Sequence, residues 1–384
     1  MAAPAHQVGD AKLPAVIRFG IVGLGYIGLF FLECNSPLAK KWIHAIETAG
    51  HEVAAVASRG KMENAKKYCN LCSKKPTPYD DYDKMMDHPG LNAVYFSLPT
   101  ALRTEWVLKA IKKKKHVLVE KPMNGVKDVK LMIEAAQNNG VQFMDGVMMM
   151  HNPRLQKILN NVTPMLTDQK DESGQVTKQV GEIRAVTSSF ATGPMDKTNI
   201  RYNPKLEPYG ALGDLGWYNI RITLWGFGWK LPKEVRAESN SIEEGWQSSV
   251  IENVQVTLFY EDGRIGRFDA EFNNSCMRQW ARLVGTKGEV HIPNFVIAKA
   301  EDTFSIIQGS WGDFDTKKFD VEDKESVVSV EKNVQEANCI RHFAAAMHKP
   351  DKFWPSIALK TQIVLDACFK SFRKGGERVQ IQVD

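Results

Sequence analysis

A glycine-rich turn is the first part of the sequence whose residue types and spacing point to a chemistry. Gly23, Gly25 and Gly28 form a GxGxxG pattern between the apolar run Ile17–Val22 and a helix predicted over Tyr26–Ala49. In a dinucleotide-binding turn, the first glycine permits the tight turn and the second lets the backbone approach a pyrophosphate, while the third lets the helix pack closely. The amino terminus of the helix offers N–H groups to the phosphates. The pattern and its flanks predict a dinucleotide site; the alternative is a structural glycine turn.

The end of the second predicted strand, Glu52–Ala57, bears on which dinucleotide would bind. NAD sites usually place an acidic residue there to hold the ribose hydroxyls. Here the strand is followed by Ser58, Arg59, Gly60 and Lys61. A hydroxyl, a guanidinium and an ammonium suit a 2′-phosphate, and there is no carboxylate to repel it. We therefore expect NADP(H) in preference to NAD(H); the alternative is a solvated turn.

A lysine stands at the end of another apolar run. Val117–Glu120 is predicted to be a buried strand, and Lys121 and Pro122 follow it directly. Ligands of open parallel sheets bind outside the carboxyl ends of the strands, which makes Lys121 a candidate functional residue. Periodicity alone is equally compatible with a surface lysine whose stem lies along apolar neighbours.

Three motifs in order resemble one known family. They are the glycine turn, Glu120-Lys121-Pro122, and the segment 210–218, which reads GALGDLGWY. Their order and separations resemble the glucose-fructose oxidoreductase, inositol dehydrogenase and rhizopine catabolism (Gfo/Idh/MocA) family. The likeness extends from about Ile17 to the C-terminus and includes Trp354-Pro355 and the helical stretch 361–372.

The resemblance implies roles for three side chains. It places Lys121 beside the nicotinamide and the substrate oxygen, and it assigns catalytic roles to Asp214 and Tyr218, which are spaced so as to share one helix face. Tyrosine at the last position resembles the glucose-fructose oxidoreductase and dimeric dihydrodiol dehydrogenase branches. Hydride transfer to a carbonyl builds negative charge on oxygen, which Lys121 would stabilise while Tyr218 supplies the proton. The nearby cation is expected to lower the pKa of Tyr218. Asp214 would orient the lysine or bind a substrate hydroxyl; the alternative is helix capping.

The remaining cofactor contacts follow from the turn and from the resemblance. No metal site is predicted. The full set of predicted cofactor contacts is Gly23, Leu24, Gly25, Tyr26, Ile27, Gly28, Ser58, Arg59, Leu98, Pro99, Thr100, Glu120 and Lys121.

The chain departs from the family pattern near the expected cleft. Arg103 stands where many members carry a histidine, and Met148–Met150 stand where many carry a tyrosine and an arginine. The flanking patterns Met-Asp-Gly at 144–146 and His-Asn-Pro-Arg at 151–154 resemble a plant-type branch of the family, whose substrates are poorly defined. The departures argue against a plain aldose and favour a broader, more apolar pocket; the alternative is methionines packed at a domain interface. The predicted substrate contacts are Met149, His151, Asn152 and Trp217.

The elements that must position these residues change in character near residue 146. Before it, strands alternate with helices, which predicts an α/β Rossmann domain with a parallel sheet and helices on both faces. After it, strand-like runs dominate, and Glu261–Arg264 marks a hairpin, which predicts an α+β domain with a large, mostly antiparallel open sheet. We predict a disordered leader over 1–15, an NAD(P)-binding domain over 16–146 and a substrate-binding and dimerisation domain over 147–384, with a polar surface insertion at 167–180.

The predicted elements are as follows. The remaining strands of the first domain are Ala93–Ser97 and Val141–Asp145, and its further helices are Met62–Tyr68, Leu102–Lys114 and Lys127–Asn138. The strands of the second domain are Glu182–Phe190, Lys233–Asn240, Val250–Tyr260, Arg264–Phe272, Arg278–Val284, Glu289–Ile292 and Thr303–Gln308, and its helices are 154–166, 334–348 and 357–373.

The composition and charge of the chain limit the expected binding partners and the expected cellular compartment. The net charge of +5 is spread along the chain without a basic stripe, which argues against nucleic-acid binding. Six thinly spaced cysteines favour a reducing compartment, and the CxxC pair Cys69 and Cys72 is interpreted as incidental thiols rather than a metal or redox site. No window approaches the ~18 apolar residues of a membrane span. The first fifteen residues lack the apolar core of a signal peptide, so we expect the cytoplasm.

These features together predict an NADP-dependent oxidoreductase. Its substrate would be a carbonyl or hydroxyl group of a sugar, a cyclic diol or a related small molecule. The alternative is a non-catalytic NADP(H)-binding sensor of the same fold, although the presence of Lys121 with Tyr218 favours chemistry. A homodimer is expected, because an open sheet face is usually buried by a partner, and the family tends to pair through that sheet.

Overall fold

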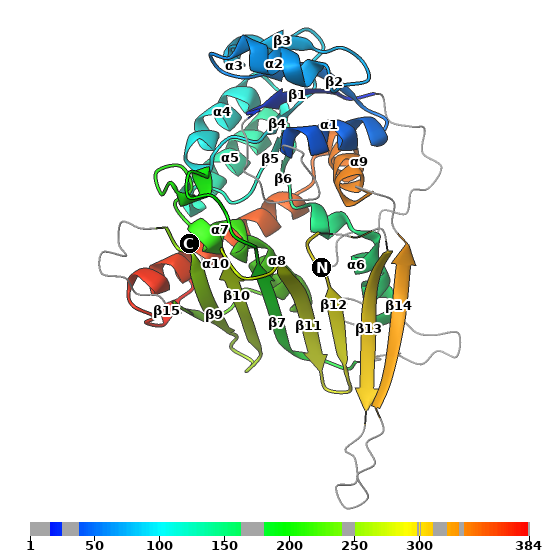
Figure 1. The fold of residues 1–384 in the computed structure, drawn as a ribbon, viewed down its shortest axis with the longest axis vertical. Helices are drawn as coiled ribbons and strands as arrows, with labels where there is room; N and C mark the ends of the chain where they lie inside the picture. The colour runs from blue at the N-terminus through cyan, green and yellow to red at the C-terminus, as the bar shows by residue number, and fades with distance from the viewer. Residues whose placement is uncertain are drawn as a thin grey trace, which may run out of the picture.

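The computed structural model describes residues 16–24, 38–162, 180–239, 250–297, 299, 301–309, 321–329 and 334–382. Two sheets lie one above the other in the view of Figure 1, and helices pack around and between them. The predicted leader, the start of the first predicted helix and residues 167–179 of the predicted insertion lie outside the described residues.

The first sheet is parallel and has the strand order β3-β2-β1-β4-β5-β6, which is the doubly wound Rossmann order. The predicted Rossmann fold is therefore confirmed. Its strands are β1 (Arg18–Val22), β2 (Glu52–Ala57), β3 (Thr77–Tyr79), β4 (Ala93–Phe96), β5 (His116–Val119) and β6 (Phe143–Asp145).

Burial on both faces explains the continuous apolar runs of this sheet. All four residues of β4 are buried, as parallel strands covered on both sides require. Helices α4 and α5 pack together, whereas α1 packs against β2 and α9 (Figure 1). The helices of this part are α1 (Leu38–Thr48), α2 (Met62–Cys69), α3 (Tyr82–Met86), α4 (Thr100–Lys112) and α5 (Val126–Asn139).

The second sheet has the order β14-β13-β12-β11-β7-β10-β9-β8-β15, and its neighbours are antiparallel except for β10 and β7. The predicted open, mostly antiparallel sheet is confirmed. Its strands are β7 (Ile183–Ala191), β8 (Glu234–Glu238), β9 (Asn253–Phe259), β10 (Ile265–Glu271), β11 (Arg278–Gly285), β12 (Glu289–Pro293), β13 (Glu301–Gly309), β14 (Val321–Ser329) and β15 (Val379–Gln380).

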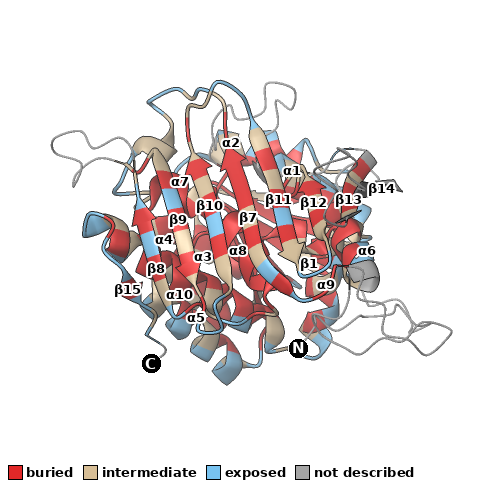
Figure 2. Cartoon of the chain, turned by 90° about the horizontal axis from the view of Figure 1, so that it is seen from below, coloured by how far each residue is buried: buried red, intermediate tan, exposed pale blue. Residues whose placement is uncertain are grey.

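The two faces of the second sheet differ. Buried and less buried residues alternate along β9, as a strand with one covered face requires. Helices α8 and α10 pack on the covered face, and Figure 2 looks onto the other face, with the strands in front and the helices behind. The remaining helices are η1 (Met148–His151), α6 (Pro153–Val162), η2 (Ile200–Tyr202), α7 (Gly210–Asp214), α8 (Gly216–Gly226), α9 (Val334–His348) and α10 (Phe353–Arg373).

Helix α10 connects the two parts of the molecule. It packs against β8 and α8, and also against α5 and β6 of the Rossmann part. Two of its side chains accept hydrogen bonds from that part: Gln362 from the backbone N–H of Met123 at 3.2 Å, and Asp366 from that of Val126 at 2.8 Å. These contacts join α10, which packs on the second sheet, to β6, to the segment after β5 and to the start of α5.

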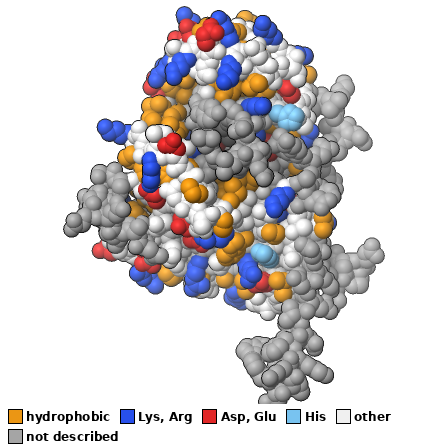
Figure 3. Space-filling view, in the orientation of Figure 1, with side chains coloured by type: hydrophobic (Ala, Val, Ile, Leu, Met, Phe, Trp, Pro, Cys, Tyr) orange, Lys and Arg blue, Asp and Glu red, His pale blue; other side chains and the backbone are white. Residues whose placement is uncertain are grey.

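The surface shown in Figure 3 carries basic and acidic side chains interspersed with one another. In the described part of the chain, no helix is both long and apolar enough to cross a membrane. The described residues also contain no cluster of three or more His, Cys, Asp or Glu side chains suited to a metal ion.

Candidate active site

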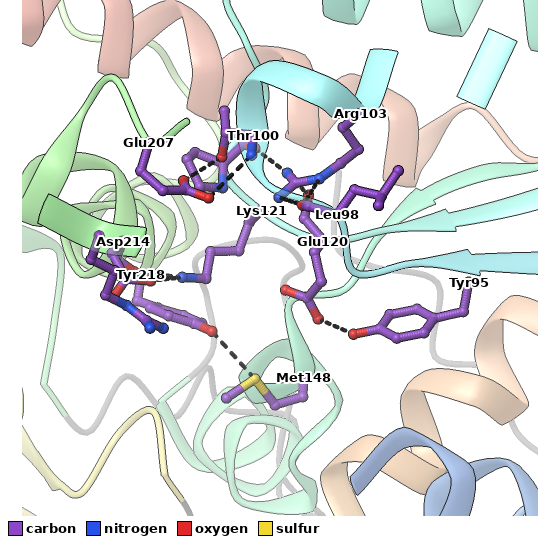
Figure 4. A network of polar contacts seen from close by, with 12 residues as sticks. Tyr95, Leu98, Thr100, Arg103, Glu120, Lys121, Met148, Glu207, Asp214 and Tyr218 are labelled. Atoms are coloured by element: carbon purple, nitrogen blue, oxygen red, sulfur yellow. Dashed lines mark hydrogen bonds and ion pairs between the residues drawn. The ribbon is translucent and has the colours of Figure 1, made fainter. Parts of the chain in front are cut away.

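Lys121 lies two residues after the end of β5, and a buried arginine holds the backbone on both sides of it. The guanidinium of Arg103, which is 4% exposed, donates to the carbonyl oxygens of Glu120 and Pro122. Its Nε and a terminal nitrogen also donate to the carbonyl oxygen of Leu98, at 3.0 and 2.7 Å. Arg103 therefore ties the turn after β4 to the end of β5, which explains an arginine at this position (Figure 4).

The ammonium of Lys121 reaches the second domain. Its Nζ lies 2.7 Å from Oδ1 and 2.7 Å from the backbone oxygen of Asp214. The side chains are 8% and 18% exposed, so the ion pair is largely removed from water. An ammonium carries three N–H groups, so these two contacts leave one for a substrate oxygen. The Nζ also lies 4.9 Å from the centre of the Tyr218 ring.

The spacing predicted that Asp214 and Tyr218 share one helix face, but the two residues lie in different helices. Asp214 is the last residue of α7, Leu215 follows it, and Tyr218 lies in the first turn of α8. The capping alternative for Asp214 also fails, because its carboxylate binds side chains rather than a helix amino terminus. The two residues still meet Lys121 together, as Figure 4 shows.

Arg201 is a charged member of the site that sequence reasoning missed. Its Nε lies 2.5 Å from Oδ2 of Asp214, and its side chain is 14% exposed. Burial alone would raise the pKa of Asp214, but the cations Arg201 and Lys121 together hold that pKa well below its usual range. Arg201 belongs to the short helix η2, outside every motif, so the sequence carried no signal for it.

Tyr218 lies in a less polar environment than expected. Its hydroxyl donates to the sulfur of Met148 at 3.6 Å, and its ring packs edge-on against Phe190 at 5.8 Å. Burial and the carboxylates of Glu120 and Asp214 raise the pKa of Tyr218 well above its ordinary value. The expected net lowering of this pKa is wrong: the cation Arg201 does lower it, but burial and the carboxylates outweigh that effect. The phenol therefore keeps its proton at neutral pH.

The first glycine of the turn is required by its backbone conformation and by the neighbouring turn after β4. Gly23 has φ +88°, and a Cβ on it would lie 2.9 Å from the carbonyl carbon of Ser97. Only glycine suits this conformation and this space. Leu24 is buried, and the further predicted contacts Gly25, Tyr26, Ile27 and Gly28 lie outside the described residues.

The turn after β2 joins the glycine turn through a shared side chain. The amide of Asn64 donates to the hydroxyl of Ser58 at 3.0 Å and to the carbonyl oxygen of Leu24 at 3.4 Å. Arg59 is exposed, and its guanidinium lies 5.9 Å from the Trp106 ring and 6.0 Å from the Tyr82 ring. Strands β1 and β2 are parallel neighbours, so Arg59 and the glycine turn follow the carboxyl ends of adjacent strands.

The predicted contacts after β4 and β5 are mostly buried. Thr100 donates its backbone N–H and hydroxyl to Glu207 of the second domain, at 3.1 and 2.6 Å. Leu98 is buried and Pro99 half-buried. Glu120 accepts hydrogen bonds from Tyr95 at 2.8 Å and from Trp42 at 3.1 Å, and burial raises its pKa.

The four predicted substrate contacts lie inside the protein. Met149 and Trp217 are 0% exposed, and His151 and Asn152 are 3% exposed. His151 contacts His342, with 2.7 Å between their Nδ1 atoms, and Asn152 donates to Asp302 at 2.9 Å. These placements favour the packing interpretation. The half-buried Met148 is the methionine that contacts Tyr218.

Among the described residues, the CxxC pair belongs to no cluster of His, Cys, Asp or Glu side chains that could hold a metal ion. Cys69 and Cys72 are free thiols, and burial raises the pKa of Cys72 to about 12. Burial also raises the pKa of Cys69, and the raised pKa of each thiol disfavours a reactive thiolate at neutral pH.

Two family models match this chain. Residues 17–147 match the model described as oxidoreductase family, NAD-binding Rossmann fold, and residues 177–291 match the Gfo/Idh/MocA C-terminal domain. The first match covers the parallel sheet, and the second covers β7 to β11 and the start of β12. Strands β13, β14 and β15 and helices α9 and α10 lie outside both matches.

Two curated proteins align with substantial parts of the chain. A dTDP-3,4-didehydro-2,6-dideoxy-alpha-D-glucose 3-reductase from Actinomadura kijaniata is 31% identical over 53% of this chain and 54% of its own length. A D-xylose 1-dehydrogenase (NADP(+)) from Haloferax volcanii is 28% identical over 75% of this chain and 81% of its own length. The chain thus spans about half the length of the first relative.

A solved structure shares the fold over nearly its whole length. It is a 3-ketoreductase from Actinomadura kijaniata in complex with NADP and TDP-benzene, with a TM-score of 0.71 and 22% identity. The match covers 94% of this chain and 98% of that one. At 22% identity, this similarity shows a shared fold and nothing further.

Proposed function

We propose that this chain, which belongs to the Gfo/Idh/MocA oxidoreductase family, is an NADP-dependent oxidoreductase that acts on a carbonyl or hydroxyl group of a sugar or related small molecule. Lys121 stabilises the reacting oxygen and Tyr218 exchanges its proton. Asp214 holds the ammonium of Lys121. The contact between Lys121 and Asp214 carries the proposal, because it brings a lysine from one domain to the Tyr218 ring of the other.

The side chains of the site suit carbonyl reduction. Negative charge develops on a carbonyl oxygen during reduction, and the partly buried ammonium of Lys121 would stabilise it more strongly than in water. The protonated phenol of Tyr218 would then donate its proton to the same oxygen. Its present acceptor is the thioether sulfur of Met148, a weak acceptor that a substrate oxygen would readily replace.

NADP(H) supplies or accepts the hydride when it is bound, and the residues of the first domain fit it. Gly23 and Leu24 would face the pyrophosphate, and Ser58 and Arg59 would contact a 2′-phosphate. No carboxylate follows β2 directly, since the next residues are Ser58, Arg59, Gly60 and Lys61. Leu98, Pro99, Thr100 and Glu120 would line the nicotinamide end.

The substrate class is argued from the relatives and from the surroundings of Tyr218. The two curated relatives are named for a deoxysugar reductase and a xylose dehydrogenase. In this chain Tyr218 contacts Met148 and Phe190, which offer apolar contacts rather than hydroxyl partners. We therefore favour a deoxysugar, a cyclic diol or a similar substrate with an apolar face.

A homodimer through the open sheet face is also part of the proposal. That face has a groove of about 450 Å³, lined by residues of β7, β8, β9, β10 and β11. The groove carries charges of both signs, and two of them, Arg278 and Asp269, form an ion pair at 2.8 Å. Because a two-fold partner presents the same surface, charges of both signs allow self-complementary pairing.

A turnover screen tests the proposed function. The purified chain is mixed with NADPH and a panel of ketosugars, aldoses and cyclic ketones, and then with NADP+ and the corresponding alcohols and diols, while absorbance of the reduced cofactor is followed. We expect turnover with at least one substrate and faster reaction with NADPH than with NADH. Tight NADPH binding without turnover on the whole panel would instead support the sensor alternative.

A further inference from the structure

The ion pair of Lys121 and Asp214 creates an electrostatic problem for the proposed function. A carboxylate bound directly to the ammonium cancels much of its charge, yet the reacting oxygen needs a net positive field. Oδ1 and the backbone oxygen of Asp214 both face Lys121 at 2.7 Å. With these two residues alone the unit would be neutral.

Arg201 supplies the missing charge. Its Nε binds Oδ2 of Asp214 at 2.5 Å, so each carboxylate oxygen has its own cation. The three side chains carry two positive charges and one negative charge, and all are less than one fifth exposed. In such partly dry surroundings the remaining positive charge acts on nearby groups more strongly than it would at the surface.

The backbone around Arg201 is held independently of Asp214. Asn199 accepts a hydrogen bond from the backbone N–H of Arg201 at 3.1 Å, which fixes the start of η2. The hydroxyl of the next residue, Tyr202, lies 2.5 Å from the amide of Asn273. A short helix anchored at both sides presents the guanidinium to Asp214 with little freedom.

We propose that Arg201 is a positioning residue for Lys121: by binding Oδ2 of Asp214 it leaves Oδ1 to the ammonium and keeps the three-residue unit positively charged beside the substrate oxygen. The catalytic part of this inference rests on the proposed function. Its electrostatic part concerns only the charge of Asp214, which a titration measures without turnover. Arg201 lies outside the three motifs that identified the other members of the site.

The direction of the effect on Asp214 follows from its neighbours. The ionisable groups beside its carboxylate are Arg201, Lys121 and Tyr218. The two cations favour the ionised form, so Asp214 stays charged as the pH falls until well below its usual pKa. Loss of Arg201 removes one of these cations, and Asp214 should then take up its proton at higher pH.

Carboxyl ¹³C chemical shifts of the full-length protein labelled in aspartate measure this directly. The Asp214 signal is identified by its absence in Asp214→Asn. We expect Arg201→Gln to raise the proton affinity of Asp214 by about 10- to 1,000-fold, the usual effect of one adjacent cation. Arg201→Lys, which keeps a charge, should give a smaller rise and also tests the proposal if the glutamine variant does not fold.

Lys197→Gln is the matched control, because it removes a cation from the same segment. Lys197 is 65% exposed and pairs with Glu252 rather than Asp214. We expect the Asp214 titration of this variant to equal that of the wild type. An unchanged Asp214 titration in Arg201→Gln and Arg201→Lys would overturn the proposal.

Turnover measurements distinguish a failure of this inference from a failure of the proposed function. On a substrate that the wild type reduces, Arg201→Gln should lower kcat about 10-fold or more with little change in NADPH affinity, because an electrostatic contribution to the reacting oxygen is weakened. Normal kcat in that variant would overturn the catalytic part. A wild type without turnover on any substrate would reject the proposed function, and the titration would still decide whether Arg201 sets the charge of Asp214.

Discussion

Glu207 of the second domain receives two hydrogen bonds from Thr100, one from the backbone N–H at 3.1 Å and one from the hydroxyl at 2.6 Å. Thr100 is the first residue of α4, whose amino-terminal N–H groups have no partners within the helix. The carboxylate thus satisfies a helix end across the two domains and complements the helix dipole. It also holds the turn that the proposed function places at the nicotinamide.

Glu207→Ala should therefore weaken both folding and cofactor binding. We expect the free energy of unfolding to fall by about 1–3 kcal/mol, because a buried helix end loses its acceptor. The Kd for NADPH should rise, since the turn at Thr100 loses its support. Urea unfolding and NADPH fluorescence measure the two effects. Glu261→Ala, an exposed hairpin position, is the control and should change neither.

Arg59→Ala tests the choice of dinucleotide. If the exposed guanidinium binds a 2′-phosphate, its loss should weaken NADPH binding by about 1.5–3 kcal/mol, the scale of a charge-assisted hydrogen bond. NADH, which lacks that phosphate, should bind almost as before. Fluorescence titration with both cofactors gives the comparison, and the exposed Lys67→Ala on α2 serves as control. Equal losses for NADPH and NADH would contradict the assignment.

Arg221 and Asp145 form a buried ion pair between α8 and the end of β6, with side chains 0% and 1% exposed. Arg221→Met should lower the free energy of unfolding by about 3–5 kcal/mol, because it leaves an uncompensated buried carboxylate. The double variant with Asp145→Asn should lose less than the sum of the two single variants, because it removes both charges. Urea unfolding of the four proteins measures the coupling, and strictly additive losses would show that the pair is not coupled.

The proposed dimer predicts a species of twice 43.2 kDa in sedimentation at micromolar concentration. Trp280→Glu should shift it toward the monomer, because it places a charge on a half-buried ring of the open sheet face. Leu131→Glu, at an exposed position of α5, should leave the dimer intact. A wild type that sediments only at 43.2 kDa would refute this interface.

The sequence was most informative where periodicity or a motif constrained the backbone. Strand β2 falls on its predicted bounds, because a buried parallel strand requires a continuous apolar run. Strand β3 and helix α3 were missed, since elements of three and five residues are too short to establish a period. Strand β14 was missed too: its sequence, VEDKESVVS, is rich in charges, and pairing with β13 rather than an apolar pattern defines it.

The residues of the site also fall into two groups: those that a motif indicated and those that the sequence did not indicate. Lys121, Asp214 and Tyr218 lie in recognisable motifs, and the structure brings them together. Arg201 and Glu207 act through long-range contacts that no local pattern records. The high pKa of Tyr218 depends on burial and on carboxylates from other elements, so a single nearby cation was a poor guide to it.

The central claim is that Lys121 and Tyr218 act as one unit on the reacting oxygen, and kinetics of three variants test it most directly. Lys121→Met removes the charge but keeps bulk, and Tyr218→Phe removes the hydroxyl but keeps the ring. On a substrate that the wild type reduces, each should lower kcat by about 10²–10⁴, the range for a lost acid–base or oxyanion-stabilising group. The double variant should be little worse than the poorer single one, because the two groups depend on each other. NADPH affinity should change little in Tyr218→Phe, and near-normal kcat in that variant would contradict the account.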